Sequence, residues 1–299
     1  MQETKIADML ENKRILFGVL PVLLAAILWG TTGTLQTLLP SSKDPYVVGA
    51  FRMLFGAATL LIVAGLYPHT RQAFARIPMT KIIGAGIAIG AYNMLFFAGV
   101  LQAGVGIGTA ITIGSAPLWV TLIMFARFAT LPSRRQVFGQ ALCIFGAVLL
   151  VLPQGQVAVP LIGVALALGS GLCYALYSLI SSEVPSDIPS NTQAAATFGV
   201  AAVVTLPVLM ILPIEWAFAP QALSTLIALG VVATGLAYAL YTWGLRSVTA
   251  STAVTLALAE PLTAWVLATT VVGERVTLVS GLGALSLFIG IAIVSLSRR

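Results

Sequence analysis

Apolar side chains occupy 59% of the 299 positions, only 8% of the residues are charged, and the mean hydropathy is +1.03. A soluble domain carries about 25% charged residues, so this chain cannot cover a water-facing surface. The composition excludes a soluble domain of any size and predicts an all-α integral membrane protein.

The chain begins with a short charged tail, 1–14, and continues as a series of apolar segments. The tail is compatible with an amphipathic helix on the membrane surface and equally with a disordered segment. Each following segment is about 20 residues long, which is enough to cross a bilayer as a helix. Numbered one to ten, the predicted transmembrane spans are 15–39, 46–67, 80–102, 104–129, 133–152, 160–182, 191–213, 219–245, 248–271 and 277–297.

The second half of the chain repeats the first. The identities are few, but they fall on proline and glycine, the residues that shape a helix. A shift of 144 positions pairs Leu101 with Leu245, Pro117 with Pro261, Leu118 with Leu262, Gly139 with Gly283 and Gly146 with Gly290, while a shift of 145 pairs Gly18 with Gly163 and Trp29 with Tyr174. We therefore predict two five-helix repeats, 15–152 and 153–299, around a central cavity near the membrane midplane.

The basic residues predict the orientation of the spans. With the N-terminus inside the cell, twelve of the fifteen Lys and Arg residues fall on the inner side: Lys5, Lys13, Arg14, Arg71, Arg76, Lys81, Arg127, Arg134, Arg135, Arg246, Arg298 and Arg299. This bias follows the positive-inside rule and places both termini in the cytoplasm of a bacterial inner membrane. The two repeats are then inverted, and the net charge of +6 reports topology, not binding to nucleic acid.

Four short motifs resemble one transporter family. They are Leu28-Trp29-Gly30-Thr31, Phe51-Arg52-Met53-Leu54, Glu260-Pro261 and Val272-Gly273-Glu274-Arg275. Together they resemble the drug/metabolite transporter superfamily, and within it the ten-helix EamA-type exporters, most of all those that export aromatic amino acids. The resemblance implies two inverted repeats, a central cavity and export of small metabolites. The first repeat departs from the pattern, because Ala116 and Thr130 stand where the second has Glu260 and Glu274.

Four residues are candidates for gating or structural roles. Pro117 and Pro261 lie in the middle of spans four and nine, where each removes a backbone hydrogen bond. A paired hinge is favoured over two static kinks, because alternating access uses symmetric elements. Glu260 is the only carboxylate near the middle of a span, and structure or gating is favoured over substrate contact. Arg52 either extends to the membrane interface or meets a substrate carboxylate or Glu260, with the interface slightly favoured.

Aromatic and hydroxyl side chains at mid-depth indicate the type of ligand. Polar groups at this depth need internal partners or a wet cavity. The predicted substrate-binding residues are Trp29, Thr32, Asn93, Phe97, Thr112, Tyr174, Tyr177, Ser178, Tyr238, Tyr241 and Thr255. Such a cavity can stack rings and hydrogen-bond amino and carboxyl groups while it carries little net charge.

These features predict a secondary transporter of neutral or zwitterionic metabolites, including amino acids. Phosphorylated solutes would require deep Lys or Arg residues, and Arg52 is the only Lys or Arg more than three residues inside a predicted span. No GxxxxGK[ST] loop occurs, so transport is secondary or passive. The alternative is a channel-like or broad-specificity efflux protein. We expect no enzymatic activity, no cofactor and no metal site, since Cys143, Cys173 and His69 are widely separated. The expected partners are the substrate and the lipid bilayer, with the protein a monomer.

Overall fold

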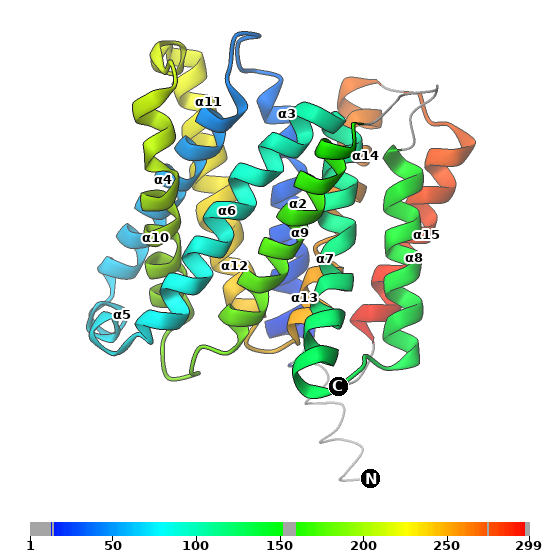
Figure 1. Cartoon of the computed structure of the whole chain (residues 1–299), viewed down its shortest axis with the longest axis horizontal. Helices are drawn as coiled ribbons and strands as arrows, with labels where there is room; N and C mark the ends of the chain where they lie inside the picture. Colours follow the sequence, from blue (N-terminus) through cyan, green and yellow to red (C-terminus); the bar gives the residue numbers. More distant parts are fainter. Residues whose placement is uncertain (1–12, 14, 152–159, 274, 297–299) are drawn as a thin grey trace.

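Every predicted span is helical in the computed structural model, which describes residue 13 and residues 15–151, 160–273 and 275–296 (Figure 1). Spans one to five are η1 (Ile15–Val19), α2 (Leu20–Gly30) and α3 (Thr32–Gln36); α4 (Pro45–Leu66); α6 (Met79–Ala103); α7 (Val105–Phe128); and α8 (Arg134–Val151). Spans six to ten are α9 (Leu161–Ser182); α10 (Ser190–Ile211); α11 (Pro220–Gly230), η4 (Val231–Leu236) and α12 (Ala237–Gly244); α13 (Ala250–Leu256), α14 (Ala259–Leu267) and η5 (Ala268–Val272); and α15 (Leu278–Ser295). The short helices α5 (Pro68–Ala73), η2 (Phe74–Arg76) and η3 (Glu215–Phe218) lie in the connections.

Nine helical stretches within the described residues are long and apolar enough to cross a membrane. They coincide with all the predicted spans except 133–152. That span forms α8, an 18-residue helix that packs along α15. At 1.5 Å per residue α8 is about 27 Å long, close to the thickness of the hydrocarbon core. The predicted all-α membrane fold is confirmed. The tail 1–14, for which a surface helix and a disordered segment were both compatible, lies outside the described residues except for Lys13.

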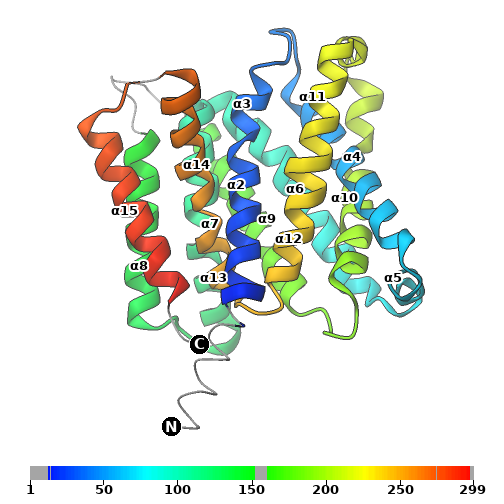
Figure 2. The ribbon, with the colours of Figure 1, turned by 180° about the vertical axis from the view of Figure 1, so that it is seen from behind.

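The chain enters and leaves the bundle at the same end. Helix η1 begins and α15 ends at this end, which we call the terminal face, and the opposite end is the far face (Figures 1 and 2). Local sequence explains several helix boundaries. Asp44 starts α4 by accepting hydrogen bonds from the backbone N–H groups of Tyr46 at 2.8 Å and Val47 at 3.3 Å, followed by a proline at the first helical position. Gly104, with φ of +84°, supplies the turn between α6 and α7, because glycine adopts a positive φ at low cost.

Helices α8 and α15 stand together at one edge of the bundle (Figures 1 and 2). They cross through four glycines that let the two backbones approach closely. A Cβ atom added to Gly146 or Gly283 would lie 2.6 Å or 2.9 Å from the carbonyl oxygen of the other glycine. For Gly139 and Gly290 the corresponding distances are 3.2 Å and 2.7 Å. Small residues of this kind are typical of helix crossings in membranes, where close backbone packing replaces the hydrophobic effect.

The same crossing shows how the two repeats are related. Cys143 Sγ contacts the carbonyl of Leu287 at 3.9 Å, and Ser286 Oγ donates to the carbonyl of Leu142 at 3.0 Å. Both pairs are separated by 144 positions, so equivalent residues of the two repeats touch each other. Such contacts arise where a pseudo-two-fold axis passes between antiparallel helices. The internal repeat read from the sequence is therefore present in the structure as an inverted one.

Six of the spans divide into two groups that the repeat relates to each other. Spans three, four and six are single α-helices (α6, α7 and α9), which we call the straight trio. Their counterparts, spans eight, nine and one, are the broken trio. Span one is interrupted at Thr31, span eight contains the π-helical η4, and span nine is interrupted at Ala257 and Leu258 and ends in the π-helical η5. π-Helical stretches of this kind often accompany functional sites.

A charged cluster ties the straight trio together at the terminal face. Glu183, at the end of α9, pairs with Arg127 near the end of α7 at 2.9 Å and with Lys81 near the start of α6 at 3.7 Å. These are the two ion pairs found in the part of the chain that the structure describes. Because the side chains are more than one-third exposed, each pair contributes less than about 1 kcal/mol, and the cluster orients the helix ends more than it stabilises them.

Candidate functional site

An aromatic cluster fills the centre of the bundle, where spans one, three, six, seven and eight meet. The ring centroids of neighbouring members are 4.4 to 6.4 Å apart, which is the range of favourable aromatic pairs. The members of this aromatic cluster are Trp29, Tyr92, Tyr174, Tyr177, Phe198, Tyr238 and Tyr241. All except Tyr92 are buried.

Helical spacing explains how two spans supply most of the rings. Tyr174 and Tyr177 stand three residues apart on α9, and Tyr238 and Tyr241 stand three apart on α12, so each pair shares one face of its helix. Trp29, on α2, completes the group. Its ring lies 4.8 Å from Tyr238, 5.4 Å from Tyr241 and 6.2 Å from Tyr174. The structure thus brings together five of the predicted substrate-binding residues.

Hydroxyl groups connect some of these rings. Ser178, also predicted, donates from Oγ to the carbonyl of Tyr174 at 2.9 Å and lies 2.8 Å from the hydroxyl of Tyr241. The hydroxyl of Tyr177 lies 3.4 Å from Thr242 Oγ1. These bonds satisfy the polar ends of Tyr177 and Tyr241 within the protein, as burial at membrane depth requires.

Three other polar atoms in the same region have no partner. The indole nitrogen Nε1 of Trp29 and Oγ1 of Thr32 are buried without a hydrogen bond. The hydroxyl of Tyr174 is likewise buried without a hydrogen bond. A buried donor that lacks a partner costs about 1–3 kcal/mol. Such atoms are typical of a site that a ligand or water completes, and they lie beside the interruption at Thr31.

Two charged side chains approach the cluster from its edge. Arg52, in α4, donates from Nε to Thr234 Oγ1 in η4 at 3.4 Å, so its side chain is turned toward span eight. Glu260 lies in the first turn of α14. The two charges act on each other and on Tyr92 and Tyr238, although they do not form an ion pair within 4.0 Å. Charges within a membrane are expensive and mark functional or strongly structural positions.

The two mid-span prolines differ in their surroundings. Helix α7 continues through Pro117 as one α-helix, whereas Pro261 follows the interruption of span nine. A helix through Pro261 would leave the carbonyl of Ala257 without its usual partner. The backbone N–H of Glu260 donates to that carbonyl at 2.9 Å. The backbone of Glu260, not its carboxylate, therefore satisfies the group that Pro261 frees.

Four predicted site residues lie at helix–helix contacts around the cluster. Asn93 donates to the carbonyl of Gly49 at 3.0 Å, linking spans three and two, and Thr112 donates to the carbonyl of Ala167 at 3.2 Å, linking spans four and six. Thr255 accepts a hydrogen bond from Gln140 of span five at 3.2 Å. Phe97 belongs to a separate hydrophobic group around Val47, Val48, Phe51 and Leu226.

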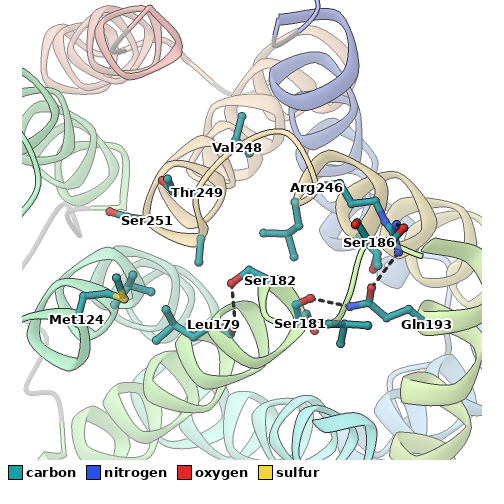
Figure 3. Close-up of a pocket in the computed structure, with 15 residues that line it drawn as sticks. Met124, Leu179, Ser181, Ser182, Ser186, Gln193, Arg246, Val248, Thr249 and Ser251 are labelled. Carbon is teal, nitrogen blue, oxygen red and sulfur yellow. Dashed lines mark hydrogen bonds between the residues drawn. The ribbon is translucent and has the colours of Figure 1, made fainter. Parts of the chain in front are cut away.

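A cavity of about 470 Å³ opens beyond the aromatic cluster, toward the terminal face (Figure 3). Its walls come from the ends of spans four, six and eight, the starts of spans seven and nine, and the connections between spans six and seven and between spans eight and nine. The lining residues are Val120, Met124, Leu179, Ser181, Ser182, Val184, Ser186, Gln193, Thr242, Leu245, Arg246, Val248, Thr249, Ala250 and Ser251. We call this space the terminal cavity.

Arg246 and Gln193 form one wall of the terminal cavity, opposite Met124 and Ser251 (Figure 3). Arg246 donates from Nη1 to the carbonyl of Ser186 at 2.9 Å and from Nη2 to the carbonyl of Ile188, while its Nε has no partner. Partial burial lowers the pKa of this guanidinium, and nearby Asp187 opposes that shift.

Sequence reasoning missed the polar wall of this cavity and the ring of Phe198. Arg246 was counted only as a topological charge, and Gln193 stands one turn into span seven, where a polar residue is typical of a span boundary. Phe198 packs 4.4 Å from Tyr238, but a phenylalanine in an apolar span carries no signal that separates it from ordinary packing. No group of three or more possible metal-ligating side chains occurs within the described ranges.

Comparisons with known proteins agree with the fold and with the internal repeat. The EamA-like transporter family matches the chain twice, over residues 16–152 and 161–296. The chain is 36% identical over 278 residues to the uncharacterized transporter YwfM of Bacillus subtilis (strain 168), covering 93% of each chain. It is 30% identical over 267 residues to the threonine/homoserine exporter RhtA of Escherichia coli (strain K12), covering 87% of this chain and 84% of that one.

One crystal structure shares the fold, with a TM-score of 0.78 at 19% sequence identity over 92% of this chain and 95% of that one. At this level of identity the likeness concerns architecture alone. The two family matches cover both halves of the chain and nearly all of its described residues. The protein is therefore a multi-pass membrane transporter that belongs to the EamA-like transporter family.

Proposed function

We propose that this transporter exports small neutral or zwitterionic metabolites, amino acids among them, by alternating access. The observation that carries the proposal is the pair of unpartnered polar atoms, Trp29 Nε1 and Thr32 Oγ1, buried beside the aromatic cluster at mid-depth. A transported solute with hydrogen-bonding groups completes them. The surrounding rings and hydroxyls supply apolar contact and neutral hydrogen bonds, which suit a solute without net charge.

Arg52 and Glu260 extend this site to a zwitterion. The guanidinium lies on the span-two side of the cluster and the carboxylate on the span-nine side. Their opposite charges match the carboxylate and ammonium groups of an amino acid without adding net charge to the membrane interior. Apart from Arg52, no Lys or Arg lies deep within a predicted span, which disfavours phosphorylated solutes.

The contrast between the two trios supports a rocking mechanism. Inverted repeats transport by exchanging conformations, so that a pseudo-two-fold rotation relates the state open to one side to the state open to the other. In this structure the straight trio is tied at the terminal face by Glu183, while the helix interruptions and π-helical stretches lie in the broken trio. We propose that the opposite state arises when the broken trio straightens and the straight trio bends.

Direction and location follow from the charges. The connections with most of the basic residues lie toward the terminal face, including those that carry Lys81, Arg127 and Arg246. By the positive-inside rule this face is cytoplasmic, with both termini inside a bacterial inner membrane. The terminal cavity then faces the cytoplasm, the side from which an exporter takes its substrate.

The identity of the substrate is the least constrained part of the proposal. The narrower resemblance, to the aromatic amino acid exporter YddG, stays a prediction. The threonine/homoserine exporter RhtA is a relative at 30% identity, which favours amino acids as a class. Both proteins export amino acids, and we therefore propose amino acids as the substrate class.

The test is efflux of radiolabelled amino acids from proteoliposomes, with Trp29→Phe compared with Trp119→Phe. The first variant keeps an aromatic ring but removes the unpartnered N–H. The second removes an indole N–H that already donates to the carbonyl of Leu168 at 3.1 Å, away from the aromatic cluster. We expect Trp29→Phe to lower efflux about tenfold, the cost of one hydrogen bond to a ligand, and Trp119→Phe to change it less than about twofold. Equal efflux in both variants removes Trp29 from the site, and steady ionic conductance would indicate a channel instead.

A further inference from the structure

The terminal cavity differs in chemistry from the aromatic cluster. Its volume of about 470 Å³ lies in the range of small-molecule sites. Hydroxyl groups are spread around its walls, and Arg246 is the charged residue of the lining, which contains no carboxylate. The hydroxyl-bearing residues are Ser181, Ser182, Ser186, Thr242, Thr249 and Ser251.

The positive charge of Arg246 is not neutralised by a direct ion pair. Its Nη atoms donate to the neutral carbonyls of Ser186 and Ile188, and Nη2 lies 3.5 Å from Gln193 Oε1. Asp187 acts on it only through space. In the described part of the chain, both ion pairs involve Glu183. A half-buried cation bonded only to neutral groups attracts an anion, because the local dielectric constant is lower than that of water.

The terminal cavity is continuous with the aromatic cluster through Thr242. This residue lines the cavity, and its Oγ1 lies 3.4 Å from the hydroxyl of Tyr177. The rings behind Tyr177 are in contact with one another: Tyr241 lies 6.1 Å away and Tyr238 5.8 Å away. A solute in the terminal cavity therefore meets hydroxyls and a guanidinium first, and a closed layer of tyrosines only afterwards.

We propose that the terminal cavity is a loading site that binds small hydroxylated amino acids, with their carboxylate held by the charge of Arg246 and their hydroxyl by the wall around Ser182 and Thr242. This inference deepens the proposed export function and rests on it. It gives the site a preference for solutes such as threonine or homoserine over aromatic amino acids. The hydroxyl of such a solute can donate to the oxygen atoms of this wall, for example Ser182 Oγ, whereas an aromatic side chain without a hydroxyl cannot.

The carboxylate part is tested by titrating the purified full chain in lipid nanodiscs with threonine and with threonine amide, which lacks the carboxylate. The wild type should bind threonine about tenfold more tightly than the amide, as expected for a charge-assisted contact. Arg246→Gln should reduce this ratio to about one, and Arg246→Lys, which keeps the charge, should retain most of it. Since each ratio is taken within one variant, a loss of folded protein does not imitate the result. A ratio unchanged in Arg246→Gln overturns the proposal.

The hydroxyl part is tested with Ser182→Ala and a matched control, Ser224→Ala. Each serine donates to the carbonyl three residues earlier, Ser182 to Leu179 at 2.7 Å and Ser224 to Gln221 at 2.9 Å, but Ser224 lies outside the terminal cavity. Ser182→Ala should weaken threonine binding about fivefold and leave tryptophan binding unchanged, while Ser224→Ala should alter neither. Equal losses for both ligands, or no loss for threonine, overturn the assignment of this wall.

The two proposals fail in different ways. In one outcome, the wild type exports amino acids from proteoliposomes while Arg246→Gln still binds threonine more tightly than its amide to the same degree. That result supports the export function and contradicts the loading site. If the wild type moves no amino acid under a gradient, the export function itself falls. Tighter binding of tryptophan than of threonine by the wild type contradicts the loading site alone.

Discussion

The straight trio and the broken trio derive from the same repeated sequence but differ in their backbones. Helices α6, α7 and α9 are uninterrupted, whereas spans eight, nine and one each contain a break or a π-helical stretch. Proline does not explain the difference, because Pro117 in α7 and Pro261 in span nine are equivalent positions. The comparison teaches that local sequence permits a break and that the packing around it decides whether the break forms.

The surroundings of two glycines illustrate this point. A Cβ added to Gly171 of α9 would meet Ser115 Oγ and lie 2.6 Å from the carbonyl of Thr112, both in the continuous helix α7. A Cβ added to Gly30 of span one would lie 2.5 Å from Thr263 Cβ and 2.9 Å from the carbonyl of Glu260, in the first turn after the interruption of span nine. The first contact is with a continuous α-helix and the second with the start of a helix that follows an interruption, so we expect the second to adjust more easily.

The largest expected effect comes from placing a larger side chain at each of these two glycines. Gly171→Val should destabilise the folded protein by about 3 kcal/mol, because α7 cannot move away without losing its own hydrogen bonds. Gly30→Val should cost clearly less, because the turn at Glu260 can adjust. Thermal unfolding of both purified variants, followed by the fraction that remains monodisperse in detergent, measures the difference. Equal losses would show that the interrupted span is as rigid as α7.

The next effect concerns the charge carried by the broken trio. Glu260→Gln should lower efflux about tenfold or more, because it leaves Arg52 as an uncompensated charge at the edge of the aromatic cluster. Thr234→Val should lower efflux less. In this variant Arg52 loses one hydrogen bond of 3.4 Å but still has the opposite charge of Glu260 nearby. Initial efflux rates in proteoliposomes with matched protein content measure both. Full activity in Glu260→Gln would exclude the carboxylate from the transport cycle.

The sequence predicts much of this arrangement because the relevant signals are local. Helical spacing brings Tyr174 and Tyr177 to one face, and the same spacing does so for Tyr238 and Tyr241. Glycines 144 positions apart indicated the repeat, and in the structure they lie at the crossing of α8 and α15, where close backbone approach requires small residues. The ten spans follow from hydropathy, which depends on composition alone.

The remaining features depend on tertiary contacts that the sequence does not display. The interruption at Thr31 and the π-helical η4 carry no proline. Asn93 is a plausible ligand-binding residue by type, yet its amide bonds to the carbonyl of Gly49. From the sequence, Arg246 indicates only the orientation of the spans, whereas in the structure it lines the terminal cavity. In each case the role depends on which helix lies opposite, and that choice is made in three dimensions.

A smaller effect on efflux should distinguish substitution of Pro261 from substitution of Pro117. Pro261→Ala restores a backbone N–H that can bond to the carbonyl of Ala257, which the N–H of Glu260 now satisfies at 2.9 Å. Span nine should straighten and efflux should fall about threefold to fivefold, because the broken state becomes less accessible. Pro117→Ala should change efflux less than about twofold, since α7 is already continuous. Distances between spin labels on α13 and α14 report the straightening directly, and unchanged distances in Pro261→Ala would contradict the role of this proline.

The smallest effect should come from the charged cluster that ties the straight trio at the terminal face. Glu183→Gln removes the partner of Arg127 at 2.9 Å and of Lys81 at 3.7 Å, and the stability should fall by less than about 1 kcal/mol because all three side chains are partly exposed. Screening by salt should reduce the difference from the wild type further, to near zero at about 1 M ionic strength. If the cluster orients the helix ends, the same substitution should still raise the rate at which labels at the ends of α7 and α9 move apart. A stability loss that persists at high salt would mean that Glu183 stabilises the straight trio through packing instead of charge.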